Sequence, residues 1–247
     1  MSGLLVAARY LTIVPVPGPA HAPLEALGRS AAWFPVVGVG LGLLLVLVDR
    51  LTGWLFSPLL AALLTVTVWK LLTGGVHLDG LADCLDGLVG RDVEHRLAIM
   101  RDSRIGAFGA VGLILFLMLE IVALAELVPP ARGSAPFVAP VIARATPAVL
   151  TALFRPARAD GHGAAFHAGV RPAAIAIGLA TAVAASIWAL GGLGVAAGAV
   201  GLVAAVAVGA FVAVRLGGVT GDVLGAAVEI SELAVLLTVS AWTYTHV

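Results

Sequence analysis

Long apolar segments dominate this chain and restrict it to the folds that a lipid bilayer tolerates. Hydrophobic residues make up 61% of the 247 residues, and charged residues make up only 11%. A transmembrane helix needs about 20 mostly apolar residues, and only helices or closed barrels satisfy their backbone hydrogen bonds in lipid. Apolar runs of roughly this length cover residues 31–50, 54–76, 105–128, 135–154, 173–191, 193–214 and 228–246. We therefore predict an all-α, polytopic membrane bundle of about seven transmembrane helices. The simplest organisation is a single membrane-embedded domain over residues 1–247.

The distribution of basic residues predicts an orientation in the membrane. Residues 3–14 are apolar but too short to span, so we expect an N-terminal helix that lies in the interface or re-enters the bilayer. With the N-terminus inside, ten of the fourteen basic residues face the cytoplasm, and only Arg50 and Arg132 lie outside. The positive-inside rule favours this multi-pass topology. The polar segments that then face the cytoplasm are 73–109, 155–171 and 215–232. A net charge of zero gives no argument for nucleic-acid binding.

Three aspartates lie close together in the stretch H-L-D-G-L-A-D-C-L-D-G, which begins at His77. On a helix, Asp79, Asp83 and Asp86 fall at about 0°, 40° and −20°, so they share one narrow face and repel one another. A cation with oxygen ligands would relieve this repulsion. Mg²⁺ usually binds one or two carboxylates together with substrate phosphates, and it suits these residues better than zinc. His77 is a candidate ligand, a candidate general base or an interfacial bystander.

The last polar segment predicts a second acidic helix face. Asp222 and Glu229 are seven residues apart, which puts them on one side of a helix. Gly225 lies on the same side, where a partner helix can approach closely. Two acidic faces at one membrane depth favour a shared metal cage. The candidate metal ligands are Asp79, Asp83, Asp86, Asp222 and Glu229.

Several basic side chains are placed to meet anions. Arg104 lies at the predicted start of the third span, where Asp102 and Ser103 are N-cap candidates and a guanidinium can bind phosphate. Arg144 lies within a span, and a guanidinium at that depth costs about 2.5–3.5 kcal/mol on insertion scales. It should therefore face a carboxylate, a phosphate or a water-filled cavity. Lys70 is expected to snorkel toward the cytoplasm.

Several sequence motifs that follow one another in a fixed order resemble those of a known family. They are H-L-D-G-L-A-D-C-L-D-G, I-M-R-D-S-R-I-G-A-F-G and G-G-V-T-G-D-V-L-G-A-A-V-E, with L-T-I-V-P-V-P, F-P-V-V-G-V-G-L-G and A-R-A-D-G-H-G around them. Together they resemble the cobalamin synthase family, the adenosylcobinamide-GDP ribazoletransferases, over most of the chain. Cys84 replaces a small or hydroxyl residue that is frequent in the family, and Ala107-Phe108 replaces the commoner Thr-Tyr. Neither change removes a carboxylate or an arginine.

The resemblance implies a Mg²⁺-dependent phosphotransferase of the bacterial inner membrane, with its active site facing the cytoplasm. Such an enzyme transfers the adenosylcobinamide phosphate moiety of adenosylcobinamide-GDP to α-ribazole or α-ribazole 5′-phosphate and releases GMP. The step belongs to the last stages of cobalamin biosynthesis. Its main catalytic need is stabilisation of charge on the pyrophosphate, for which metal ions and arginines are the usual means.

Roles follow for the candidate residues on this hypothesis. Mg²⁺ would be held on the diphosphate by Asp79, Asp83 and Asp222, with Asp86 or Glu229. Phosphate oxygens would be bound by Arg104, Arg158 and Arg144, of which Arg104 would also stabilise charge in the reaction. The proton of the attacking hydroxyl would pass to Asp86, Asp102 or His77, among which spacing does not choose.

A transporter with an acidic, cytoplasm-facing cation site is the alternative from another functional class, because intramembrane acids and broken helices also build ion pathways. A transporter needs access from both faces, whereas the acidic clusters here map to one. A third interpretation, a non-catalytic scaffold, predicts that Asp79→Asn and Asp83→Asn retain activity. Small-molecule substrates and the lipid bilayer are the expected partners. Assembly into a homo-oligomer is left open.

Overall fold

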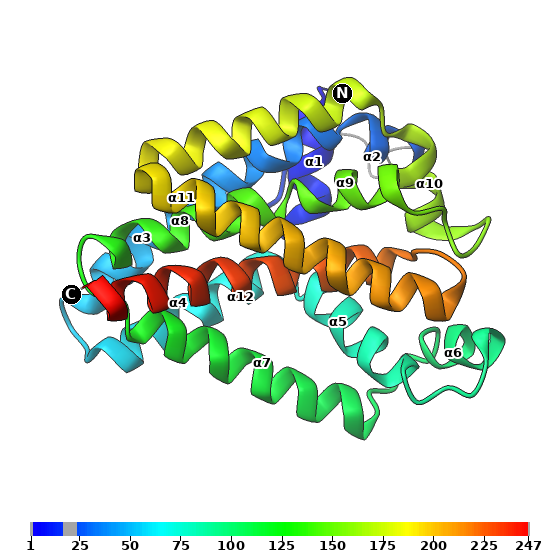
Figure 1. The fold of residues 1–247 in the computed structure, drawn as a ribbon, viewed down its shortest axis with the longest axis horizontal. Helices are drawn as coiled ribbons and strands as arrows, with labels where there is room; N and C mark the ends of the chain where they lie inside the picture. Colours follow the sequence, from blue (N-terminus) through cyan, green and yellow to red (C-terminus); the bar gives the residue numbers. More distant parts are fainter. Residues whose placement is uncertain (1, 17–23, 247) are drawn as a thin grey trace.

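The computed structural model describes residues 2–16 and 24–246, which form a helical bundle (Figure 1). Its elements are α1 (Gly3–Leu11), α2 (Leu24–Arg29), the 3-10 helix η1 (Ala31–Trp33), α3 (Phe34–Gly53), α4 (Pro58–Leu72), α5 (Val76–Gly87), α6 (Val93–Ile99), α7 (Ala107–Ala125), α8 (Ala131–Ala143), α9 (Thr146–Leu153), α10 (Gly161–Gly169), α11 (Pro172–Leu216) and α12 (Gly221–His246). Within these described ranges there is no β-strand, and a single isolated bridge joins Pro156 to Val219. The all-α prediction is confirmed.

Several helices are long and apolar enough to cross a membrane. In the described part of the chain they are Ala31–Gly53, Ala107–Ala125, Ala131–Leu153, Pro172–Leu216 and Gly221–His246, which makes 5. α4 and α5, bent by 90° at their junction, raise the number to 6 if the pair counts as one span. The polytopic bundle is thus confirmed, whereas the exact count of seven is not.

The longest helix, α11, turns back on itself. Gly191 has φ 57° and ψ −135°, a backbone conformation that interrupts the helix and that glycine adopts without penalty. The segments before and after it meet at this turn, run back in roughly opposite directions and diverge away from it (Figure 1). The two predicted spans 173–191 and 193–214 correspond to these two segments.

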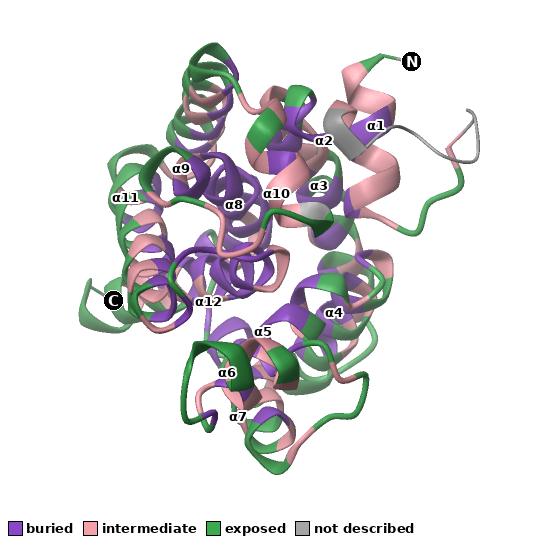
Figure 2. Ribbon diagram, turned by 90° about the vertical axis from the view of Figure 1, so that its right-hand side faces the viewer, coloured by how far each residue is buried: buried purple, intermediate pink, exposed green. Residues whose placement is uncertain are grey.

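α12 lies at the centre of the bundle, where it packs against α5, α8, α9 and α11. Nearly every residue of its first half is buried, including the small side chains of Ala226 and Ala227. Figure 2 shows the same burial along α8 and α12. α7 differs, because Val111, Ile114 and Met118 on its outer face are more than half exposed. A large apolar face of this kind is suited to contact with lipid.

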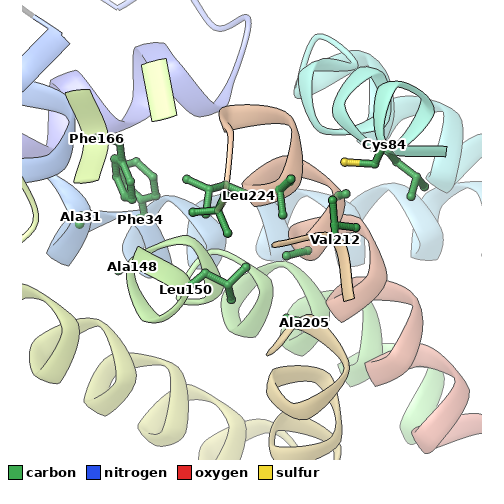
Figure 3. Close-up of a cluster of buried hydrophobic side chains, with 14 of the residues drawn as sticks. Ala31, Phe34, Cys84, Ala148, Leu150, Phe166, Ala205, Val212 and Leu224 are labelled. Atoms are coloured by element: carbon green, nitrogen blue, oxygen red, sulfur yellow. The ribbon is translucent and has the colours of Figure 1, made fainter. Parts of the chain in front are cut away.

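An aromatic cluster fixes the N-terminal helices. The Phe34 ring lies between Phe166, with ring centroids 5.3 Å apart, and Tyr10, with ring centroids 6.2 Å apart. Phe34 and Phe166 are drawn in Figure 3. α1 has nine residues, which gives a length of about 13 Å at 1.5 Å per residue, too short to cross the hydrocarbon. The predicted short helix is therefore present, and its depth in the membrane stays a prediction.

The three polar segments meet at one end of the bundle. Backbone hydrogen bonds of 2.9 Å join Ala157 to Val219 and Val219 to Arg155. The Arg96 guanidinium donates to the Arg215 carbonyl at 3.2 Å. This end carries α5, α6 and α10, whereas the α3–α4 and α7–α8 connections lie at the opposite end (Figure 1). The chemistry-bearing segments are therefore neighbours in space.

Candidate active site

Two glycines let α5 and α12 touch through their backbones. A Cβ atom added at Gly80 would lie 2.7 Å from the carbonyl oxygen of Asp222. One added at Gly225 would lie 3.3 Å from the Cα of His77. The close approach predicted at Gly225 is thus present, and it places the acidic helix α5 directly beside the first turn of α12.

A cavity of about 360 Å³ opens at this helix contact. Its polar wall includes Asp79 and His77 of α5, Asp222 of α12 and Arg9 of α1. The remaining wall is largely apolar and aromatic, and it includes Tyr10, Leu11, Phe34, Pro147, Phe166 and Leu224. Carboxylates from two separate helices therefore face one cavity.

A second cavity of about 200 Å³ adjoins the first and shares Asp222, Gly163 and Gly221 with it. Arg158 lines this second cavity, and its Nη2 atom lies 3.4 Å from Oδ2 of Asp222. The Thr220 hydroxyl donates to the same carboxylate oxygen at 3.1 Å. Asp222 thus stands where the two cavities meet, with one arginine beside it.

The aspartates of the site carry more negative charge than the neighbouring basic side chains neutralise. The charges of Asp79, Asp222 and Asp86 repel that of Asp83, and Arg158 attracts it. Among the described residues, no hydrogen bond or ion pair engages the carboxylates of Asp79 and Asp83. Asp79 is exposed, whereas Asp83 is partly buried and lines neither cavity. Carboxylate oxygens without partners are suitable ligands for a hard cation such as Mg²⁺.

The spacing of these carboxylates also bears on the metal. In the described chain, Asp79, Asp83 and Asp222 do not form a group of three ligand atoms within 4.8 Å of one another. Mg²⁺ usually keeps several of its waters and takes one or two carboxylates together with substrate phosphates. The aspartates fit such an open, partly hydrated site better than a closed cage.

Asp86 has a structural contact that the sequence did not predict. Its Oδ2 accepts the backbone N–H of Gly106 at 2.7 Å, and its Oδ1 accepts that of Gly109 at 2.8 Å. Asp86 therefore caps the N-terminus of α7, the role that was expected of Asp102 and Ser103. Both carboxylate oxygens are engaged, so the expectation that Asp86 binds metal or accepts a proton gains no support from its position.

Asp102 and Arg104 pair with each other outside the helices. The guanidinium makes hydrogen bonds of 2.6–3.2 Å to the carboxylate, and the Arg104 side chain is 86% exposed. These hydrogen bonds lower the pKa of Asp102 to about 2. Neither residue lines either of the two cavities. The structure thus does not bring Arg104 or Asp102 to the aspartates.

Three other charged candidates lie in what we call the buried ion cluster, which comprises Lys70, Glu120, Arg144, Glu229 and Glu232. The Lys70 ammonium lies 3.0 Å from Glu120, 2.6 Å from Glu229 and 2.9 Å from Glu232. Arg144 pairs with Glu232, and both side chains are at most 1% exposed.

These contacts correct three expectations. Lys70 does not snorkel toward the cytoplasm but points into the bundle. Arg144 faces a carboxylate, one of the three partners expected of it, and so is not placed to bind substrate phosphate. Glu229 is paired with Lys70 instead of joining the aspartates. In each case the contacts depend on partners that are distant in the sequence, and the spacing of residues along one helix does not reveal such partners.

Other lining residues were missed at the sequence level. Tyr10, Phe34 and Phe166 come from three separate segments and carry no local motif. Glu120 did carry a signal, because a single carboxylate within a strongly apolar span indicates a buried partner.

Comparison with known proteins identifies the family of this chain. The family model for cobalamin-5-phosphate synthase matches residues 3–240. The chain belongs to this family. A relative from Brevibacillus brevis is 40% identical and covers 98% of this chain and 99% of its own length. One from Geotalea daltonii is 38% identical over 96% of each chain. Both are named adenosylcobinamide-GDP ribazoletransferase. No solved structure gives a significant match. The resemblance expected from the motifs is confirmed, and the transporter alternative finds no support in the family.

Proposed function

We propose that this protein is an adenosylcobinamide-GDP ribazoletransferase whose reaction takes place in the cavity between α5 and α12. The observation that carries the proposal is the convergence of Asp79 and Asp222, from two helices far apart in sequence, on one cavity beside Arg158. Family membership supports the activity, and the named relatives support the substrates.

The reaction is a substitution at phosphorus. A ribose hydroxyl of α-ribazole, or of its 5′-phosphate, forms a bond to the cobinamide-linked phosphorus, and the bond from that phosphorus to GMP breaks. Arg158 would bind phosphate oxygens by bidentate hydrogen bonds. Of the three candidate proton acceptors, His77 is the one that lines the cavity, and its buried Nδ1 has no hydrogen-bond partner among the described residues. We therefore favour His77 for this role.

Asp79, Asp83 and Asp222 would hold Mg²⁺ on the diphosphate. When bound, Mg²⁺ supplies Lewis-acid stabilisation of the negative charge that builds up on the phosphate oxygens. The aromatic and aliphatic wall of Tyr10, Phe34, Leu11 and Leu224 would exclude water and strengthen the electrostatic interactions inside. On the topology predicted from the basic residues, the cavity opens on the cytoplasmic face of the inner membrane.

The test is an assay of detergent-purified protein with adenosylcobinamide-GDP and α-ribazole, with and without Mg²⁺. We expect chromatography to show the joined product and equimolar GMP only when Mg²⁺ is present. Asp222→Asn should reduce the rate by about two orders of magnitude or more, which is the usual effect of removing one contact that stabilises charge in the transition state. The exposed Asp92→Asn serves as the matched control and should be unaffected. Ion flux through liposomes without any GMP release would decide for transport and against this proposal.

A further inference from the structure

The buried ion cluster is connected to the elements that carry the site. α12 supplies Glu229 and Glu232 to the cluster and Asp222 to the cavity. Seven residues separate Asp222 from Glu229, which is about 10 Å along a helix. Lys70 lies in the last turn of α4, directly before the bend that leads into α5. The cluster therefore lies about two helical turns along α12 from Asp222, and it ties α12 to the end of α4 that leads into α5.

Lys70 is fixed at both of its ends. Its backbone carbonyl accepts the N–H of Gly75 at 3.0 Å and the hydroxyl of Thr73 at 3.1 Å. Gly74 and Gly75 have φ values of 63° and 67°, which permit the 90° bend between α4 and α5. Its side chain reaches three glutamates on two other helices. The direction in which α5 leaves the bend thus depends on a residue that is itself anchored to α12.

The electrostatics of the cluster require this lysine. Oxygen atoms of Glu120, Glu229 and Glu232 lie within 4.8 Å of one another in a fully buried position. The Lys70 ammonium occupies their centre, and the rings of Trp69 and Phe116 face it at 4.7 Å and 5.5 Å. Removing one partner of a buried pair leaves uncompensated charge, which destabilises far more than the loss of a surface pair.

We propose that Lys70 is a positioning residue for the active site. It acts as the built-in cation of the buried ion cluster and thereby holds α5, with Asp79 and Asp83, against Asp222 of α12. The positional part of this proposal is independent of the activity, whereas its consequence for catalysis rests on the proposed function.

The one cysteine of the chain reports on the positional part without any activity measurement. Cys84 lies on α5, is 5% exposed, and belongs to the same hydrophobic cluster as Val223 and Leu224 of α12 (Figure 3). If α5 loosens from α12, this thiol becomes accessible. In detergent-purified Lys70→Met we expect the rate of Cys84 labelling by N-ethylmaleimide to rise about tenfold or more, the effect of a lost buried partner.

Two further variants separate positioning from general damage. The charge-balanced combination Lys70→Met, Glu120→Gln and Glu229→Gln keeps the Arg144–Glu232 pair and should restore most of the protection. Arg132→Met breaks an ion pair of comparable burial with Asp49 at the other end of the bundle and should leave the labelling rate unchanged. Should Lys70→Met fail to fold, Glu229→Gln removes the charge of the carboxylate nearest to the Lys70 ammonium and should also raise the labelling rate.

The results that would overturn the proposal are distinct. Labelling at the native rate in folded Lys70→Met, or in Glu229→Gln, contradicts the anchoring of α5. An equal rise in Arg132→Met shows general loosening and contradicts a local role. For catalysis, we expect the Mg²⁺ concentration for half-maximal rate to rise several-fold in Glu229→Gln while the maximal rate falls less. If labelling rises but the Mg²⁺ dependence is unchanged, only the link between Lys70 and the metal site is refuted. If the unmodified protein has no transferase activity, the proposed function fails, whereas the labelling result still tests the anchoring of α5.

Discussion

Replacing Gly80 with alanine should separate the two acidic helices by a predictable amount. The new Cβ would lie 2.7 Å from the carbonyl oxygen and 3.0 Å from the Cα of Asp222. Because ordinary contacts begin at 3.4 Å, the helices must move apart by about 0.7 Å at this point. Both atoms belong to the backbone, so a change of side-chain rotamer cannot relieve the clash.

The expected consequence is a larger loss of activity than of stability. Overpacking of this kind costs about 1–3 kcal/mol. A misplacement approaching 1 Å at reacting groups can reduce a rate by up to about 100-fold. We therefore expect Gly80→Ala to lower the rate of GMP release by about 10- to 100-fold while its unfolding temperature in detergent falls by a few degrees.

Gly40→Ala provides the matched control, because a Cβ added to this glycine of α3 meets nothing within 4 Å. It should leave the rate unchanged and raise the stability by about 0.5–1 kcal/mol, since alanine is the better helix former. A native rate in Gly80→Ala would refute the argument that this contact sets the distance between the aspartates.

Three further predictions concern single side chains. Asp86→Asn should lower the unfolding temperature, at a cost of about 1 kcal/mol, because an amide cannot accept both backbone N–H groups of α7; an altered Mg²⁺ dependence at native stability would show instead that Asp86 binds metal. Since Arg104 lowers the pKa of Asp102 to about 2, their pairing contributes stability above the ordinary pKa and loses it as the pH falls toward 2. In Arg104→Ala, the Asp102 titration followed by NMR should move up toward about 3.9, and an unmoved midpoint would contradict the pairing. Arg158→Gln should raise the KM for adenosylcobinamide-GDP about tenfold or more, and an unchanged KM would remove Arg158 from phosphate binding.

The sequence predicted those features that depend on local periodicity. The spacing of Asp79 and Asp83 placed both on one face of α5, and Gly225 marked the close approach to α12, because helical geometry alone determines these relations. The family motifs then identified the chemistry. Even the acidic cavity was accessible to this reasoning, since it lies where two acidic helix faces meet.

Features that depend on remote partners could not be predicted in this way. Asp86 and Asp79 look equivalent in spacing, but only Asp86 meets the free backbone N–H groups of α7. Lys70 and Glu229 lie 159 positions apart, yet their side chains meet at 2.6 Å in the buried ion cluster. The direction of Lys70 depends on a 90° bend at Gly74 and Gly75, and a glycine pair marks the end of a helix without specifying the angle of the bend.

Metal binding in the absence of substrate tests the central claim most directly, because that claim is the sharing of one cation by α5 and α12. Electron paramagnetic resonance of detergent-purified protein titrated with Mn²⁺ reports the bound ion, and added Mg²⁺ should displace it. We predict that Asp79→Asn and Asp222→Asn each weaken Mn²⁺ binding about tenfold or more, as expected for the loss of a charged ligand, whereas Asp92→Asn does not. Native-strength binding in both of these site variants would contradict the account.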